Sequence, residues 1–309
     1  MERIYKKRKT LHCIRYRGIL IYKMSNKVVI ACDSSCDLGP KLCERYHINL
    51  NPFRINVGDE TFLDGVNITP DDLYAYHEKT GLLSKTSAIN VAEHEEFFKQ
   101  NLKDADELIF FTISSSMSVN YQNACIAAES FNNVYVVDSG NLSTGVGLLV
   151  LTAADLAEQG KSAKEIIAEV ERLRANVNAS FVIDTLEFLH KGGRCSALAA
   201  LGANLLKLKP CIEVKNGAMG VAKKYRGKFA EVLKTYAKER LENPDNLYLN
   251  RVFITHAGCD PKIAEEIAAL VKELAPFNEV FITRAGATVS THCGPNTLGV
   301  LFIQKTPVE

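Results

Sequence analysis

The sequence predicts an α/β fold of two domains, in which parallel and mixed sheets are flanked by helices. Three observations support this prediction. Apolar strand-like segments alternate with amphipathic helical segments through the first half of the chain, which is typical of βαβ units and a largely parallel sheet. The second half contains an Asn-Gly pair between two alternating runs, the signal of an antiparallel hairpin. The 309 residues, 47% of them apolar, suffice for two domains of medium size.

The first half is predicted to contain three apolar strands and five helices. Thr69 followed by Pro70 begins one helix, because proline is well tolerated at the first helical position. Asn90 and Ser162 each precede a glutamate by three residues, which is a capping-box pattern. In chain order the predicted segments are strand 27–33, helix 69–81, helix 90–102, strand 108–114, helix 121–130, strand 134–138, helix 145–159 and a helix that begins at 162.

The second half is predicted to form a mixed sheet with its own helices. Asn216-Gly217 suits the turn of a two-stranded hairpin, and Asp260-Pro261 caps a later helix. In chain order the predicted segments are strand 180–184, helix 185–193, a helix of small residues over 197–208, hairpin 211–223, helix 228–241, strand 251–256, a helix from 260, and strands 279–284 and 298–305.

A basic extension, residues 1–23, precedes the two predicted domains, which span 24–178 and 179–309. The extension holds eight Lys and Arg against one Glu; because the whole chain carries +1, the remainder carries −6. We expect the extension to be disordered or to stem from an upstream start codon. The alternative is a tail that binds nucleic acid or a membrane surface. The acidic body argues against nucleic acid as the main partner.

Nine cysteines are scattered along the chain, with no Cys-x-x-Cys pair and no visible signal peptide. An odd number of dispersed thiols predicts a cytoplasmic protein with reduced cysteines. Cys32, Cys36 and Cys43 come nearest to a cluster, but they lack zinc-finger spacing, so we expect no metal site. No apolar run reaches the roughly 18 residues that span a bilayer, which predicts no membrane span.

Four hydroxyl-rich loops follow a predicted strand or precede a predicted helix. They are 33–38, 84–90, 114–120 and 138–145. In parallel sheets, ligands bind at the carboxyl ends of the strands, where loops meet helix N-termini. Such loops offer neutral donors, which suit a carboxylate or a phosphate. Alternatively, the hydroxyls serve only as helix caps.

Familiar nucleotide-binding and hydrolase motifs are absent from the sequence. The segment 191-KGGR-194 ends a short helix and places Arg194 either in solvent or in a crevice, as the partner of an anion. His292 stands beside Cys293 and is a structural histidine, a general base, a metal ligand or the partner of a nucleophile. In an extended segment, neighbouring side chains point to opposite sides, so we do not expect a Cys–His catalytic pair.

Taken in order, nine stretches of the sequence resemble the DegV family. They are 33-DSSCDL, Asp64-Gly65, 85-KTSAIN, 113-ISSSMSVNYQNA, 137-VDSGNLSTGVG, 184-DTLEFLHKGGR, 203-ANLLKLKPCIEVKNG, Lys224-Tyr225-Arg226 and 291-THCGPNTLG. The resemblance runs from about Lys27 to the C-terminus and leaves the first 23 residues outside. Each stretch alone is weak evidence for the family. The set is specific because the stretches follow one another in the same order as in the family.

The resemblance implies a bacterial lipid-binding protein with a long-chain fatty acid between two α/β domains, and not an enzyme. In some bacteria a family member is an acyl carrier that presents the fatty-acid carboxylate to a separate fatty acid kinase, which is a possible partner here. By position, Thr86 and Ser118 would contact the carboxylate, with Arg194 and His292 close by. No catalytic residue, metal or further cofactor is implied. One departure is Val119, where the family has glycine, because valine lacks glycine's freedom at positive φ.

Several alternatives stay open. A buried methylene contributes roughly 0.8 kcal/mol, so about 15 of them would contribute up to about 12 kcal/mol of tail binding. The candidates for the wall around such a tail, each equally suited to ordinary core packing, are Ile113, Ala199, Leu201 and Leu205. Another class of function is an enzyme on a small carboxylated or phosphorylated substrate, with His292 as acid and base. A docking patch or a solvated basic face would be formed by Lys223, Lys224, Arg226 and Lys228.

Overall fold

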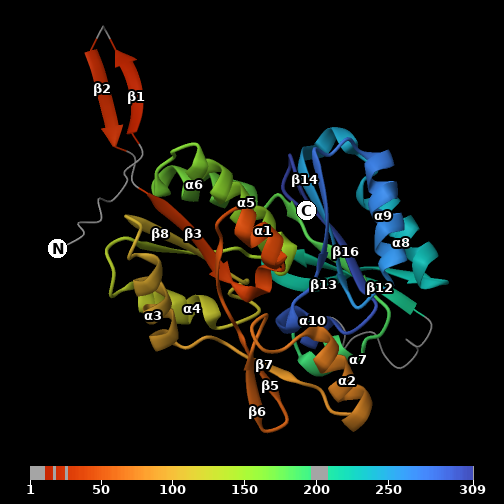
Figure 1. The fold of residues 1–309 in the computed structure, drawn as a ribbon. Coiled ribbons are helices and arrows are strands. Elements are labelled where there is room, and N and C mark those ends of the chain that lie inside the picture. Colours follow the sequence, from red (N-terminus) through yellow and green to blue (C-terminus); the bar gives the residue numbers. More distant parts are fainter. Residues whose placement is uncertain (1–10, 17–18, 25–26, 196–207, 309) are drawn as a thin grey trace.

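The structure, a computed structural model, describes residues 11–16, 19–24, 27–195 and 208–308. Its ribbon shows two main sheets that lie side by side, with helices around them (Figure 1). One sheet is parallel and the other is mixed. The predicted α/β class with parallel and mixed sheets is therefore confirmed.

A four-stranded parallel sheet forms much of the first half. In spatial order its strands are β4 (Asn49–Asn51), β3 (Val28–Asp33), β8 (Glu107–Thr112) and β9 (Val134–Asp138). The helices around it are α1 (Gly39–Arg45), α3 (Val91–Asn101), α4 (Asn120–Ala128), α5 (Thr144–Glu158) and α6 (Ala163–Arg174). On β8, Phe110 packs in the cluster of α3 and α4, whereas Ile109 and Phe111 pack in that of α5 and α6. Both faces are covered, as parallel sheets require.

A mixed sheet of seven strands forms the second half. In spatial order its strands are β13 (Ala218–Arg226), β12 (Leu208–Lys215), β11 (Ser180–Ile183), β16 (Thr297–Gln304), β14 (Leu247–Ala257) and β15 (Glu279–Arg284), with β10 (Val177–Asn178) also paired to β16. Helices α8 (Phe229–Arg240) and α9 (Pro261–Leu274) cover one face. The predicted hairpin is confirmed, because β12 and β13 pair around Asn216-Gly217, both at positive φ.

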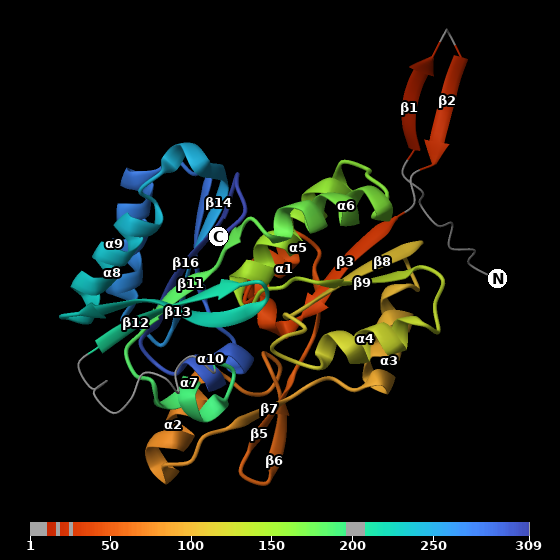
Figure 2. The same ribbon diagram turned by 180° about the vertical axis from the view of Figure 1, so that it is seen from behind.

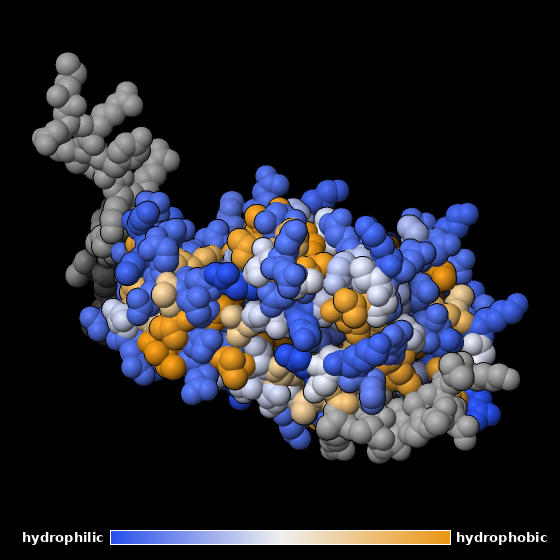
Figure 3. Space-filling model, turned by 90° about the horizontal axis from the view of Figure 1, so that it is seen from below, coloured by the Kyte–Doolittle hydropathy of each residue, from blue (hydrophilic) through white to orange (hydrophobic). Residues whose placement is uncertain are grey.

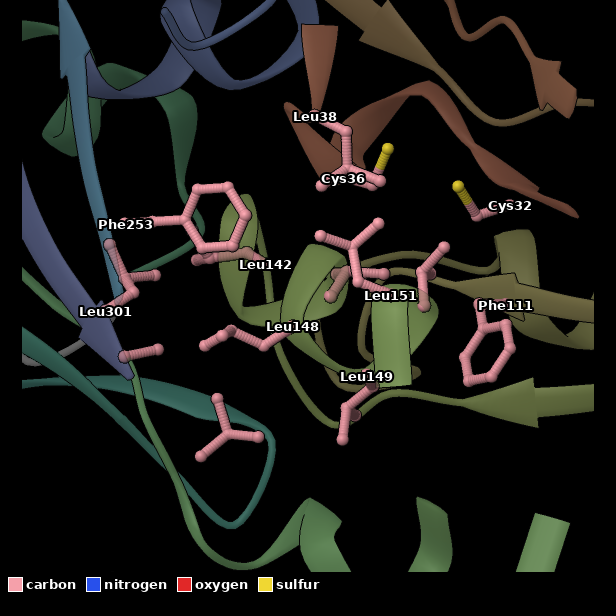
Figure 4. Close-up of a cluster of buried hydrophobic side chains, with 14 of the residues drawn as sticks. Cys32, Cys36, Leu38, Phe111, Leu142, Leu148, Leu149, Leu151, Phe253 and Leu301 are labelled. Carbon is pink, nitrogen blue, oxygen red and sulfur yellow. The ribbon is translucent and has the colours of Figure 1, made fainter. Parts of the chain in front are cut away.

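Helix α5 lies between the two sheets and is buried on almost every side (Figure 4). Leu148, Leu149 and Leu151 are completely buried. They belong to one apolar cluster that also contains Phe111 of the first sheet and Leu301 of the second. A helix that is apolar all round is a core helix, and this one gives both halves a continuous core.

On the face that Figure 3 shows, the surface has no apolar area comparable with this buried cluster. Hydrophobic side chains gather there in small patches that hydrophilic ones separate (Figure 3). Within the part of the chain that the structure describes, no helix is both long enough and apolar enough to cross a membrane. The large apolar clusters lie inside the molecule.

The sequence analysis does not predict a third, antiparallel sheet. Its strands, in spatial order, are β6 (Glu60–Leu63), β5 (Arg54–Val57) and β7 (Lys85–Ser87). The helices nearby are α2 (Pro70–Thr80), α7 (Glu187–Gly192) and α10 (Ala287–Cys293). Strand β7 occupies part of 84–90, which the sequence analysis treats as a loop. Strands of three or four residues are too short to show a clear alternation.

The chain passes from the first sheet to the second slightly earlier than predicted. Strand β10 already pairs with β16, so Val177 and Asn178 belong to the second sheet and not to the predicted domain 24–178. Helix α10, from the predicted domain 179–309, packs back against α2, β5 and β7. This packing places His292, which lies in α10, against elements from the first half of the chain.

The basic extension contains a hairpin, whereas the sequence analysis expects a disordered segment. Strands β1 (Leu11–Tyr16) and β2 (Ile19–Met24) pair antiparallel. The sequence of β2 has isoleucines and a tyrosine, and such β-branched and aromatic residues favour strands. The hairpin stands away from both main sheets in two opposite views (Figures 1 and 2).

Candidate functional site

All four predicted site residues line one cavity. Thr86, Ser118, Arg194 and His292 come from four separate segments and meet at an empty space of about 630 Å³, part of which is open to solvent. The remaining wall is mostly apolar: Phe53, Ala88, Ile113, Met117, Leu142, Phe181, Leu189, Met219, Thr288, Val289 and Cys293. It includes the predicted wall residue Ile113. The other three predicted wall residues, like the predicted helix 197–208, lie outside the described residues: Ala199, Leu201 and Leu205.

Thr86 and His292 are joined by a hydrogen bond. Thr86 lies in β7, His292 lies in the last turn of α10, and Oγ1 of the first is 2.9 Å from Nε2 of the second. The extended segment expected at His292 is wrong, because residues 287–293 form a helix. Successive side chains on a helix point about 100° apart, so His292 and Cys293 still face different directions. Burial also raises the pKa of the Cys293 thiol well above its ordinary value, which argues against a nucleophile.

His292 is held as a neutral imidazole. Burial, and after it the charge of Arg194, lowers its pKa to about 4. Its Nδ1 is buried and has no hydrogen-bond partner among the described residues. Gly192 lies so close that a Cβ there would be 2.6 Å from this nitrogen. Buried N–H groups are almost always paired, so the proton belongs on Nε2. Nε2 then donates to Thr86 Oγ1 and leaves the threonine proton free for a ligand.

Ser118 is presented by the loop between β8 and α4. Its Oγ accepts the backbone N–H of Asn120 at 3.2 Å, and its own N–H donates to Ser114 O at 3.2 Å. Within the described chain no acceptor takes the Ser118 hydroxyl proton, which is free to point into the cavity. Val119, the departure from the family pattern, has φ −71°. The loop therefore does not need a glycine at this position.

Arg194 lies at the exposed rim of the cavity. One of its guanidinium nitrogens, Nη1, donates to Gly192 O at 2.6 Å. Its positive charge reaches His292 and contributes to the lowered pKa of that ring. An anion at the cavity mouth would feel the same charge, although water and salt weaken the effect at an exposed position.

Two buried aspartates, to which the sequence analysis assigns no role, hold the N-terminus of α10. The backbone N–H of Ala287 donates to Asp64 Oδ1 at 2.7 Å, and that of Gly286 donates to Asp37 Oδ1 at 2.8 Å. The first N–H groups of a helix lack partners within the helix, so carboxyl oxygens that accept hydrogen bonds from them stabilise the helix start. Both aspartates fall within the stretches that resemble the DegV family, so the sequence could have identified them as candidates. It does not indicate their partners at the start of α10, which lie more than 200 residues further along the chain.

A second, smaller cavity adjoins the first. Its empty space is about 340 Å³, part of it open to solvent, and it shares four wall residues with the larger one: Leu142, Phe181, Val289 and Cys293. The remaining wall comes from the loop before α5, from β14 and β16, and from the segment before α10: Ser143, Thr255, His256, Ala257, Ala285, Thr297, Gly299 and Leu301. The sequence analysis does not predict this second cavity, because each of its wall residues is of a type that is common in strands and loops.

The described residues contain no group of side chains that could hold a metal ion. Cys32, Cys36 and Cys43 lie in the apolar cluster around α5. Burial raises the pKa of Cys43 to about 12. Metals bind thiolates, so this environment does not favour binding at these three residues.

The chain is similar to a known family over almost its whole length. The family model described as an uncharacterised protein family, DegV, matches residues 27–305. A DegV domain-containing protein of Clostridium acetobutylicum is 32% identical over 283 residues, which cover 90% of this chain and 99% of the relative. Another, from Clostridium perfringens, is 30% identical over 289 residues, which cover 91% and 99%.

Solved structures have the same fold. A fatty-acid-binding DegV family protein of Thermus thermophilus has a TM-score of 0.81 and 29% identity, covering 90% of this chain and 99% of that one. DegV of Bacillus subtilis, described as a fatty acid binding protein, has a TM-score of 0.79 and 27% identity, covering 91% and 100%. Together with the family match over residues 27–305, these likenesses show that the chain belongs to the DegV family.

Proposed function

We propose that the protein binds a long-chain fatty acid in the cavity lined by Thr86, Ser118, Arg194 and His292. The observation that carries the proposal is the meeting of two hydroxyl donors and one arginine, distant in sequence, at a mostly apolar cavity. Such donors suit a carboxylate, and the apolar wall suits an acyl chain. The similar proteins of Thermus thermophilus and Bacillus subtilis are named for fatty acid binding, which supports it.

The carboxylate is held by a relay of neutral donors. His292 Nε2 donates to Thr86 Oγ1, 2.9 Å away, and the Thr86 hydroxyl in turn donates to the ligand. Ser118 supplies the second hydroxyl, and Arg194 supplies positive charge from the rim. A buried carboxylate must recover in hydrogen bonds what it loses in hydration. The histidine therefore orients a donor and does not itself carry charge.

The acyl tail runs from the first cavity into the second, between two domains that correspond to the two main sheets. The two cavities share four wall residues, which include Phe181 and Val289 and would surround the tail where it crosses between them. Each methylene contributes roughly 0.8 kcal/mol when it leaves water. The tail thus supplies most of the affinity, and the head group sets the position of the ligand.

The protein acts as a cytoplasmic acyl carrier, and not as an enzyme. An acid/base enzyme would need His292 to titrate near neutral pH, but burial lowers its pKa to about 4. The carrier would present the fatty-acid carboxylate to a fatty acid kinase. A purified bacterial fatty acid kinase and ATP should convert the bound acid to acyl phosphate, and an unreacted ligand would contradict this role.

Lipid extraction tests the binding itself. Protein purified under gentle conditions from a bacterial host, then denatured and extracted, should release close to one fatty acid per chain by mass spectrometry. Thr86→Val should lower this content about tenfold, because it removes the hydroxyl and leaves His292 Nε2 unpaired. The exposed Thr235, whose hydroxyl bonds only its own helix at Glu231 O, gives the control Thr235→Val. Extracts without fatty acid would count decisively against the proposed function.

A further inference from the structure

Asn120 connects the two loops that carry the proposed head-group hydroxyls. We propose that Asn120 is a positioning residue, which fixes the places of Thr86 and Ser118 without touching the ligand. This inference rests on the proposed function and deepens it, because it names what holds the two hydroxyls in register. Asn120 is the first residue of α4, is completely buried, and is not part of the wall of either cavity.

The side-chain amide of Asn120 makes three contacts. Nδ2 donates to Asp33 Oδ2 at 2.9 Å, while Oδ1 accepts the backbone N–H of Ile89 at 3.2 Å. Oδ1 also lies 3.2 Å from Nε2 of His94. Burial lowers the pKa of His94 to about 4, so this ring is neutral. Because Asn51 Nδ2 donates to His94 Nδ1 at 3.3 Å, Nε2 carries the proton and donates to Asn120.

These contacts reach both hydroxyls. Ile89 follows Thr86 by three residues, so its hydrogen bond to Asn120 holds the segment that leaves β7. The backbone N–H of Asn120 donates to Ser118 Oγ at 3.2 Å and leaves the serine proton to point elsewhere. One residue thus fixes the loop of the first hydroxyl and the orientation of the second.

The pattern of partners requires an amide at this position. Asp33 offers only acceptors, so its partner must donate, whereas Ile89 N–H and His94 Nε2 need an acceptor. Asp33 also accepts the backbone N–H of Ile113 at 2.8 Å, at the start of the Ser118 loop. Loss of the amide would leave buried polar groups unpaired in both loops, and the loops would shift to pair them.

The test compares oleic acid with oleyl alcohol as competitors of a fluorescent fatty acid analogue bound to the full-length protein. The alcohol shares the tail but lacks the carboxylate, so the ratio of the two affinities reports head-group recognition. For Asn120→Ala we expect the preference for the acid to fall about tenfold, while the alcohol affinity changes less than about twofold. Asn120→Thr replaces the amide with a single hydroxyl, which can make only part of the contacts, so it should give an intermediate ratio. It serves if the alanine variant does not fold.

Asn176→Ala is the matched control. Asn176 is also buried and donates through Nδ2 to Gln304 O at 2.9 Å, but it lines neither cavity. It should lower stability and keep the acid-to-alcohol ratio. A wild-type ratio in both Asn120 variants, or an equal fall in both affinities, overturns the positioning role alone. A wild-type protein that does not prefer the acid overturns the proposed head-group site, and this inference with it.

Discussion

A single histidine ring decides the geometry of the proposed head-group site, and two glycines allow the helices α7 and α10 to approach each other closely around it. Gly192 of α7 faces the ring of His292, with a Cβ position 2.6 Å from Nδ1. Gly294 follows α10 at φ 72° and faces Phe188 of α7, with a Cβ position 2.6 Å from that ring. Each short helix therefore packs an aromatic ring onto a glycine of the other. This close approach brings His292 within reach of Thr86.

Gly192→Ala should impair fatty acid binding although Gly192 is not part of the cavity wall. The added Cβ pushes the His292 ring away, and the hydrogen bond to Thr86 is lost. We expect affinity for oleic acid to fall about tenfold in the displacement assay. Gly193→Ala is the control, because its Cβ would meet nothing within 4 Å. Its φ of 68° makes that variant less stable by about 1 kcal/mol. Unchanged binding by Gly192→Ala would contradict the role given to His292.

The sequence predicts which side chains meet at the cavity, but not their chemical state. The resemblance to the DegV family names Thr86, Ser118, Arg194 and His292, and all four line one cavity. The neutral state of His292 could not be predicted, because it depends on burial by segments distant in the chain. Asn120 escaped notice for a similar reason: its three partners lie 26 to 87 residues away, and a helix start is an ordinary place for asparagine.

Helices and strands whose stabilising residues lie close together in the sequence were predictable. Those stabilised by residues far away in the sequence were not. Asn90 and Ser162 form the predicted capping boxes, and Thr69, predicted only as a helix start, forms one as well. All the groups involved lie within four residues. Helix α10 has the sequence 287-ATVSTHC-293, whose β-branched residues favour a helix poorly. It forms nonetheless, since Asp64 and Asp37 from the first half of the chain cap its N-terminus.

Helix α10 should also limit the length of the acyl chain. Val289 lines both cavities, so a larger side chain there would narrow the passage that we propose for the acyl tail. We expect Val289→Phe to shift the extracted fatty acids toward chains shorter by roughly two methylenes, as measured by mass spectrometry. Leu270→Phe on α9 is the control, because Leu270 packs in the C-terminal cluster away from both cavities. An unchanged distribution of chain lengths would mean that the tail does not use the second cavity.

The molecule as a whole is held together by contacts that the predicted domain boundary does not reveal. Strand β10 joins the second sheet before the predicted boundary, and α10 returns to the first half. Asp37 lies at the centre of this arrangement. It forms a 2.5 Å hydrogen bond with the Ser143 hydroxyl next to α5 and accepts the Gly286 N–H at 2.8 Å. Hydrophobic periodicity predicts each half separately but carries no information about such links.

The stability of the whole protein should respond to pH in two opposite ways. Burial raises the pKa of Asp33 to about 6, and burial together with the charges of Asp64 and Asp33 raises that of Asp37 to about 8. A carboxyl with a raised pKa stabilises the fold at low pH and loses that contribution as pH rises through its folded value. Burial lowers the pKa of both His94 and His292 to about 4, so their contribution is lost as pH falls below about 6.5.

Asp37→Asn isolates the alkaline side of this response. Between pH 6.5 and 8 the contribution of the two histidines is complete and no longer changes with pH, so the wild-type protein should lose stability through Asp37 while the variant loses less. Urea unfolding at each pH should show a slope difference of up to about 1.4 kcal/mol per pH unit, the limit for one proton. Asparagine can still accept the Gly286 N–H and donate to Ser143, so the variant should fold. The exposed Asp59 gives the control Asp59→Asn, which should follow the wild-type curve. Parallel curves for wild type and Asp37→Asn would mean that Asp37 is already ionised in the folded protein, and that the link between the two halves does not depend on its proton.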